Sequence, residues 1–180
     1  GRIAGERTAA RAGARKPPTG AWPVIYHERI SSGLIGHLLS ATNGTAIARG
    51  ASWARELMGE RILPAGLTLA EQPHRARVSG SRPFDAEGLR TSDREIVSDG
   101  VLTGWTLDLA TARKLGLSST ASAARGTGGP PSPSVGNVAL TQGSQSLEDM
   151  MRDMGRGLLV TSMIGSSINA TTGDYSRGAS

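Results

Sequence analysis

The stretch Tyr26-His27-Glu28-Arg29-Ile30-Ser31-Ser32-Gly33-Leu34-Ile35-Gly36-His37 opens like the metal-binding helix of a zinc protease and then departs from that pattern. In such a helix, a second histidine follows the His-Glu pair one turn later, so that two imidazoles bind one ion and the glutamate acts as general base. Here Ser31 and Ser32 occupy the positions of that second ligand. His37 follows His27 by ten residues, which on a straight helix is roughly 15 Å of rise and about 80° out of line. The two histidines therefore cannot share an ion on an unbroken helix, and whether the chain binds a metal becomes the central question.

Apolar spacing, together with signals at both ends, predicts a helix over this stretch. The β-favouring run at residues 22–26 predicts a strand before it, and Asn43-Gly44 is typical of a helix end. Beyond that end, apolar residues from Ile47 to Met58 predict a second amphipathic helix that stops at Gly59. The spacing of the first helix is carried by Ile30, Leu34, Ile35, Leu38 and Leu39.

Turn and capping residues divide the rest of the chain into short elements. Asp99-Gly100 is the strongest two-residue hairpin signal, Asp108 predicts a helix start, and Ser146 opens a capping-box variant. Residues 158–164 predict a buried strand. Residues 118–133 are rich in Ser, Ala, Gly and Pro and predict a mobile loop of the kind that often carries function.

The composition excludes several kinds of site and partner. The 180 residues contain no cysteine, which excludes disulfides, thiol nucleophiles and thiolate zinc sites and favours a reducing cytoplasm. The apolar runs are too short to span a bilayer, so we expect no membrane partner. The net charge of +5 suits nucleic acid, but much of the excess lies in the first 16 residues, and aromatic residues make up only 3% of the chain. We therefore do not expect nucleic acid as a partner.

Other catalytic patterns are missing or incomplete. The chain contains no Gly-x-Ser-x-Gly elbow, no Walker loop and no Gly-x-Gly-x-x-Gly fingerprint. A metal at His27 would need a distant third ligand such as His74 or Asp174. His27 as ligand and Glu28 as base remain candidates on this ground. Ordinary structural roles remain open as well, for His27 at the lip of a groove and for His37 on a helix face near the core.

Several segments, in the same order, resemble the PmbA/TldE branch of the TldD/PmbA family, whose members are called modulators of DNA gyrase or microcin-maturation proteases. The likeness runs from about residue 5 to the end of the sequence. It is carried by residues 23–37, Arg82-Pro-Phe-Asp-Ala-Glu-Gly-Leu-Arg-Thr91, Asp99-Gly-Val-Leu102, Ala112-Arg-Lys-Leu-Gly-Leu117 and, most specifically, Gly173-Asp-Tyr-Ser-Arg-Gly-Ala-Ser180.

This resemblance implies an α+β fold, namely an antiparallel, curved-sheet-rich domain with a few short helices. It implies that residues 1–20 are a basic tail or linker that follows another domain, and that residues 21–180 are part of a TldD/PmbA C-terminal-type domain. In the family's TldD subunit, a His-Glu-x-x-x-His helix binds zinc together with a later cysteine. His27 and Glu28 match the start of that pattern, whereas Ser32 replaces its second histidine. We therefore expect no cofactor in this chain and zinc in a TldD-like partner.

The function that the resemblance implies is that of a subunit in a cytoplasmic complex of the TldD–PmbA type, which processes or degrades extended or unfolded peptides in microcin maturation and antitoxin turnover. This chain would be the non-zinc subunit, paired with a TldD-like subunit or with another copy of itself. A peptide would be held by strand addition near residues 118–133 and 165–180. One alternative is a metallopeptidase active in its own right. The other is a regulatory protein without enzymatic activity that acts on gyrase-linked or RNA-binding partners.

Overall fold

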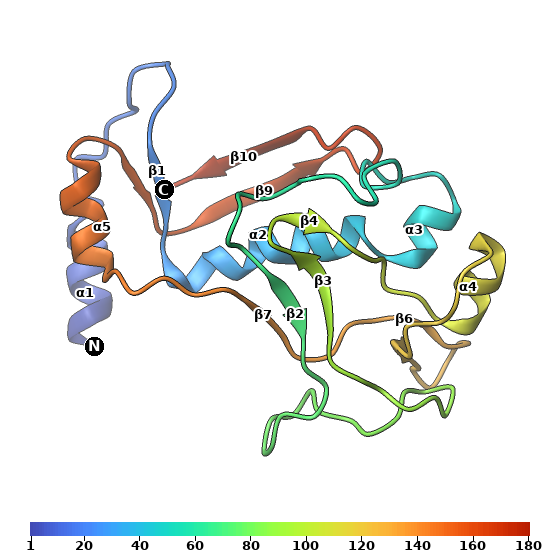
Figure 1. Cartoon of the computed structure of the whole chain (residues 1–180). Helices are drawn as coiled ribbons and strands as arrows, with labels where there is room; N and C mark the ends of the chain where they lie inside the picture. Colours follow the sequence, from blue (N-terminus) through green and yellow to red (C-terminus); the bar gives the residue numbers. More distant parts are fainter.

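The computed structural model describes residues 1–180, apart from the side chains of residues 166 and 167, and it mixes short helices with small sheets (Figure 1). The helices are α1 (Arg2–Ala9), α2 (Glu28–Ala41), α3 (Gly44–Ala48), α4 (Leu109–Leu115) and α5 (Leu147–Met154). The strands are β1 (Val24–Tyr26), β2 (Leu69–Glu71), β3 (Arg94–Ser98), β4 (Val101–Leu102), β5 (Ala123–Ala124), β6 (Ser132–Pro133), β7 (Val138–Leu140), β8 (Leu158–Val160), β9 (Met163–Ile168) and β10 (Tyr175–Ala179).

Helix α2 runs through the middle of the molecule, with sheets on either side of it (Figure 1). It begins directly after His27 and continues without a break past Gly33 and Gly36. Leu38 and Ala41 in its last turns are buried and join the hydrophobic core. Because the helix is unbroken, the separation between His27 and His37 that the sequence predicts also holds in the structure.

A four-stranded antiparallel sheet, in the order β4-β3-β2-β7, forms the other side of that core. The predicted hairpin at Asp99-Gly100 is confirmed, because these two residues connect β3 to β4 with φ angles of 44° and 81°. Both angles lie in the left-handed region that a tight two-residue turn requires. The buried side chains of the core are Leu38, Ala41, Ile47, Ala54, Leu69, Ile96, Val97 and Leu102.

The predicted strand over residues 158–164 is in fact divided between two sheets. Its first part, β8, pairs in parallel with β1, whereas β9 pairs antiparallel with β10. The chain changes partner at Thr161 and Ser162, whose amides both donate to the carbonyl of Ser180 at 2.8 Å. The apolar residues 158–164 therefore belong to two short strands instead of one buried strand.

The predicted second helix from Ile47 to Met58 is wrong beyond Ala48. Helix α3 ends at Ala48, and Gly50 takes a φ of 70°, which is incompatible with a right-handed helix. The amide of Trp53 then donates to Ala170 at 2.9 Å instead of to the preceding turn. Tertiary hydrogen bonding thus overrides the apolar spacing of this segment.

The predicted helix starts are confirmed by their capping hydrogen bonds. Asp108 accepts from the Thr111 amide in a full capping box, and Ser146 accepts from the Asp149 amide. With the mostly antiparallel sheets and the short helices, these elements confirm the expected α+β fold. None of the helices that the structure describes is both long and apolar enough to cross a bilayer.

Candidate functional site

His27 and Glu28 lie at the start of α2, and no further metal-ligating side chains gather around them in the described part of the chain. His27 is the N-cap residue, and its Nδ1 accepts a hydrogen bond from the Arg29 amide at 3.2 Å. Glu28 is exposed in the first turn, and Ser32, which stands in place of the second histidine, is exposed one turn further on. One imidazole nitrogen of His27 is therefore already used in capping the start of the helix.

The two distant candidates for a third ligand have other hydrogen-bond partners. His74 Nε2 lies 2.9 Å from the Thr91 hydroxyl, and the Asp174 carboxylate accepts from the Thr172 hydroxyl at 2.6 Å. Within the described part of the chain, no three His, Asp or Glu side chains are placed so that they could share a metal ion. The residues present at His27 therefore do not fit a zinc ion.

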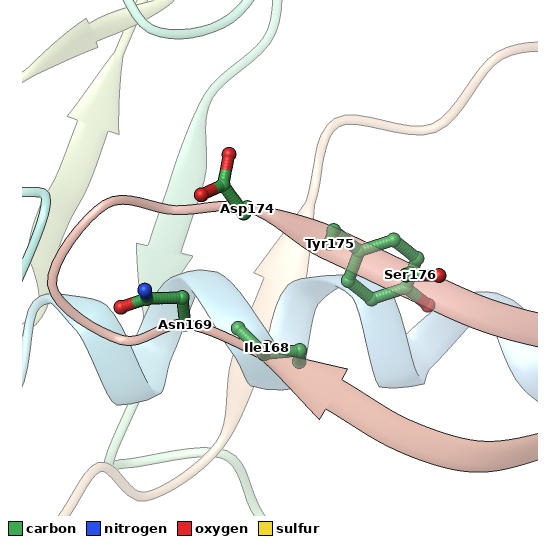
Figure 2. Close-up of a pocket in the computed structure, with 5 residues that line it drawn as sticks. All are labelled: Ile168, Asn169, Asp174, Tyr175 and Ser176. Atoms are coloured by element: carbon green, nitrogen blue, oxygen red, sulfur yellow. The ribbon is translucent and has the colours of Figure 1, made fainter.

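A different feature, a row of three adjoining cavities, follows the C-terminal half of α2. The first, of about 590 Å³, lies at the turn end of the β9–β10 hairpin. Figure 2 shows its lining residues on the two sides of the hairpin, with α2 behind them. Tyr175 packs against α2 here, with its ring centroid 5.6 Å from that of His37. The lining residues are Ile168, Asn169, Asp174, Tyr175 and Ser176.

The other two cavities continue this row toward the far side of α2. One, of about 210 Å³, is lined by His37, Ser40, Trp53 and Ile168, among others, and shares Ile168 with the first. The last, of about 190 Å³, shares Ser40 with the second and extends to Pro133, Ser134 and Val135. We call this row of cavities the α2 groove. It brings together parts of both segments that the sequence analysis selected, residues 118–133 and 165–180.

One polar atom beside the α2 groove has no hydrogen-bond partner among the described residues. His37 Nε2 is buried and has no hydrogen-bond partner among the described side chains and backbone. An unsatisfied buried nitrogen is costly. Sequence reasoning placed His37 near the core and gave Tyr175 no role. A tyrosine inside the Gly-Asp-Tyr-Ser segment of a chain with few aromatic residues was the available signal.

The predicted mobile loop at residues 118–133 is instead anchored at both ends. Arg82 donates to the carbonyls of Ala123 and Ser134 at 3.3 and 2.8 Å. Asn43, beside the α2 groove, donates to the carbonyl of Pro133 at 2.9 Å. The tip, residues 125–130, is exposed, and so are Ser118 and Ser132 near the two ends. The wall that this loop gives to the groove is therefore held in place by hydrogen bonds.

A buried ion pair reinforces the same wall. Arg94 Nε donates to Glu71 Oε2 at 2.8 Å, and both side chains are largely shielded from solvent, at 15% and 4% exposure. The other oxygen, Glu71 Oε1, accepts from the Gly136 amide at 2.5 Å. Arg94 also donates to the Thr106 hydroxyl at 3.0 Å. The pair thus ties β2 and β3 to the segment that follows β6.

Comparisons with known proteins agree with this architecture. Residues 19–180 match the PmbA/TldA metallopeptidase C-terminal domain. Metalloprotease PmbA of Escherichia coli O157:H7 is 42% identical over 173 residues, which are 96% of this chain and 36% of that protein. TldE from Thermococcus kodakarensis has a TM-score of 0.74 at 26% identity, over 83% of this chain and 35% of that one.

A further solved structure, from Bacteroides thetaiotaomicron, is named for modulation of DNA gyrase. It has a TM-score of 0.88 at 30% identity and covers 99% of this chain and 38% of that one. The chain thus spans little more than a third of the length of these relatives. The family match covers nine-tenths of the chain, and sequence and structure agree on it, so this chain belongs to the PmbA/TldD metallopeptidase family, whose C-terminal domain it matches.

Proposed function

We propose that this chain is the non-zinc, PmbA/TldE-type subunit of a two-subunit peptidase, in which it holds an extended peptide while a TldD-type subunit supplies the zinc. The observation that carries the proposal is the α2 groove, which combines an apolar floor with unpaired hydrogen-bonding capacity. The poor fit of His27, Glu28 and Ser32 to a zinc ion supports the assignment of the metal to a partner. Relatives named metalloprotease and TldE support the proteolytic context.

An extended peptide suits the groove because its side chains alternate in direction along the chain. Successive side chains of an extended peptide point to opposite sides, so every second residue faces the same wall. The β9–β10 hairpin is a two-stranded sheet, and the outer edges of its strands are not paired with any described strand. Peptide backbone amides and carbonyls add to such edges, while adjoining cavities accept alternate side chains. His37 Nε2 would then pair with a polar group of the bound peptide.

Peptide cleavage with and without a TldD-type subunit tests the proposal. We expect no cleavage of an unstructured peptide by this chain alone, and chelator-sensitive cleavage when the TldD-type subunit is added. We expect the two proteins to elute together in size-exclusion chromatography. Cleavage that the TldD-type subunit performs equally well without this chain would overturn the proposal.

A second candidate, a metallopeptidase active in its own right, is favoured by the names of the relatives. In that case His27 would be a metal ligand and Glu28 the general base that activates water. Stoichiometric zinc in the purified chain, lost in His27→Ala and kept in His37→Ala, whose histidine lies too far along α2 to share an ion with His27, would establish this candidate in place of the first. Zinc below stoichiometric amounts in the unsubstituted chain would eliminate it.

A further inference from the structure

We propose that the cavity between α1 and the start of α2 is a recognition site for a carboxylate of the bound peptide, an inference that rests on the proposed peptide-holding function. This cavity has a volume of about 340 Å³, within the range of roughly 300–1,000 Å³ that is typical of ligand sites. It is separate from the α2 groove and shares no lining residue with it. Its lining includes Arg7, Arg11, His27, Arg29, Thr161 and Ser180.

The side-chain charge of this lining is entirely basic. Three arginines and one histidine are among the lining residues, and no Asp or Glu is among them. Within the described part of the chain, Arg7, Arg11 and Arg29 make no ion pair, whereas Arg2 on the same helix as Arg7 pairs with Glu6 at 2.7 Å. The arginines that border the cavity therefore keep their charge available for a ligand.

The lining offers hydrogen-bond donors, so it suits a ligand with acceptor atoms and not a metal cation. His27 Nδ1 accepts from the Arg29 amide, so in the neutral imidazole the proton is on Nε2, which is then a donor. Guanidinium groups have donors only, in a planar arrangement that matches the two oxygens of a carboxylate. In the sequence, His27 stands where a zinc-protease helix has its first metal ligand. In the structure, its donor suits an anion better. A divalent cation would be repelled by this lining.

A peptide carboxylate fits the cavity better than a nucleic acid does. No aromatic side chain other than the imidazole lines it, so it offers no surface on which a base could stack. Thr161 and Ser180 belong to the segments that flank β9 and β10, and the Thr161 amide donates to the Ser180 carbonyl at 2.8 Å. The cavity and the α2 groove therefore border the same hairpin. A peptide that lies along the hairpin can present a carboxylate, from its C-terminus or from an acidic side chain, to the three arginines.

Binding of labelled peptides, measured by fluorescence anisotropy at low salt, tests this site. Three versions of one unstructured hexapeptide are compared: a free acid, a C-terminal amide, and an amide that carries one glutamate. We expect the free acid to bind at least about tenfold more tightly than the plain amide, because a charge-assisted hydrogen bond strengthens binding by about this factor. The glutamate version shows whether a side-chain carboxylate replaces the terminal one.

Matched variants separate this site from general peptide binding. Arg29→Gln and Arg7→Gln should lose the preference for the acid. Arg75 is exposed and lines neither this cavity nor the α2 groove, so Arg75→Gln should keep the preference. Added salt should reduce the preference by screening. Equal binding of all three peptides to the unsubstituted chain, or an unchanged preference in both cavity variants, would overturn the carboxylate site and leave the α2 groove intact. Failure of every peptide to bind would instead overturn the proposed function together with this site.

Discussion

At the scale of single residues, the close approach of two segments depends on Gly44 having no side chain. A Cβ at this position would lie 2.7 Å from both the Thr106 carbonyl oxygen and a Leu107 methyl carbon. The Gly44 amide also donates to Thr106 at 2.8 Å, so the backbone cannot move away freely. We expect Gly44→Ala to lower the free energy of unfolding by about 1–3 kcal/mol, as overpacking does. Urea denaturation measures this change.

Gly36→Ala is the matched control for this substitution. Gly36 lies inside α2, and a Cβ there would meet nothing within 4 Å. Alanine is favoured over glycine in a helix interior by about 0.5–1 kcal/mol, so this variant should be more stable than the unsubstituted chain. Changes of the same sign in the two variants would contradict the packing argument.

The turn residue Asp99 gives the stability a small dependence on pH. A hydrogen bond from the Gly66 amide, at 2.5 Å, and the Arg61 guanidinium lower the pKa of Asp99 in the folded chain. A lowered folded pKa means that this stabilisation is complete above the unfolded pKa of about 3.9 and is lost as the pH falls through the folded value. We therefore expect acidification from about pH 6 to about pH 3 to lower the urea midpoint more in the unsubstituted chain than in Asp99→Asn.

Asparagine is the suitable replacement for Asp99 because it keeps the backbone of the turn. Asp99 has a φ of 44°, and Asn tolerates this left-handed conformation nearly as well as Asp does. The amide cannot ionise, so its hydrogen bonds do not change with pH over this range. An equal loss of stability in both proteins would show that Asp99 does not contribute to the acid sensitivity.

At the scale of elements, the buried pair of Glu71 and Arg94 holds the wall of the α2 groove. Glu71→Ala would leave the Arg94 guanidinium without its carboxylate at a largely buried position, and would remove the acceptor of the Gly136 amide. Breaking one partner of a buried pair costs about 3–5 kcal/mol. We expect a loss of this size in urea denaturation. Glu6→Ala, which breaks an exposed pair with Arg2, should change stability by less than about 1 kcal/mol, and similar losses in both variants would refute the role of burial.

Elements whose signals are local could be predicted from the sequence. The turn at Asp99-Gly100 and the helix starts at Asp108 and Ser146 depend on residues within one turn of each other, and the structure confirms all of them. The segment after Ile47 has a helical pattern of apolar residues as well. Its helix stops at Ala48 because Trp53 pairs with Ala170, which no short-range pattern can reveal.

The candidate site shows the same division between local and distant information. The position of His27 at the start of α2 follows from the sequence, and so does the separation between His27 and His37. The α2 groove does not, because it exists only where the β9–β10 hairpin and residues 133–135 meet opposite sides of one helix. The buried Glu71 that anchors residue 136 likewise comes from a distant strand. Composition alone predicts a mobile loop over the neighbouring residues 118–133, because these hydrogen-bond partners are distant in the sequence.

At the scale of the whole molecule, the α2 groove and the hairpin beside it should act as one surface for an extended peptide. Ile168 is the residue that the first two cavities share, so a charge there would disturb both at once. We expect Ile168→Asp to weaken binding of an unstructured peptide by at least about tenfold, since an apolar contact is replaced by a carboxylate that must stay hydrated. Fluorescence anisotropy of a labelled peptide measures the loss.

The control for this prediction lies on the same strand. Ile164, also in β9, is 67% exposed and lines none of the three cavities of the groove, so Ile164→Asp adds the same charge to the same hairpin outside the groove. Near-normal peptide binding by Ile164→Asp, together with weak binding by Ile168→Asp, would place the peptide in the groove and not on the hairpin in general. Equal losses in the two variants would mean that the hairpin's charge or folding, and not the cavities along α2, governs binding.

The packing of this hairpin on α2 depends on the aromatic ring of Tyr175, which lies against His37. A Tyr175→Phe variant keeps that ring, so it should keep the packing and bind the peptide as the unsubstituted chain does in the same anisotropy measurement.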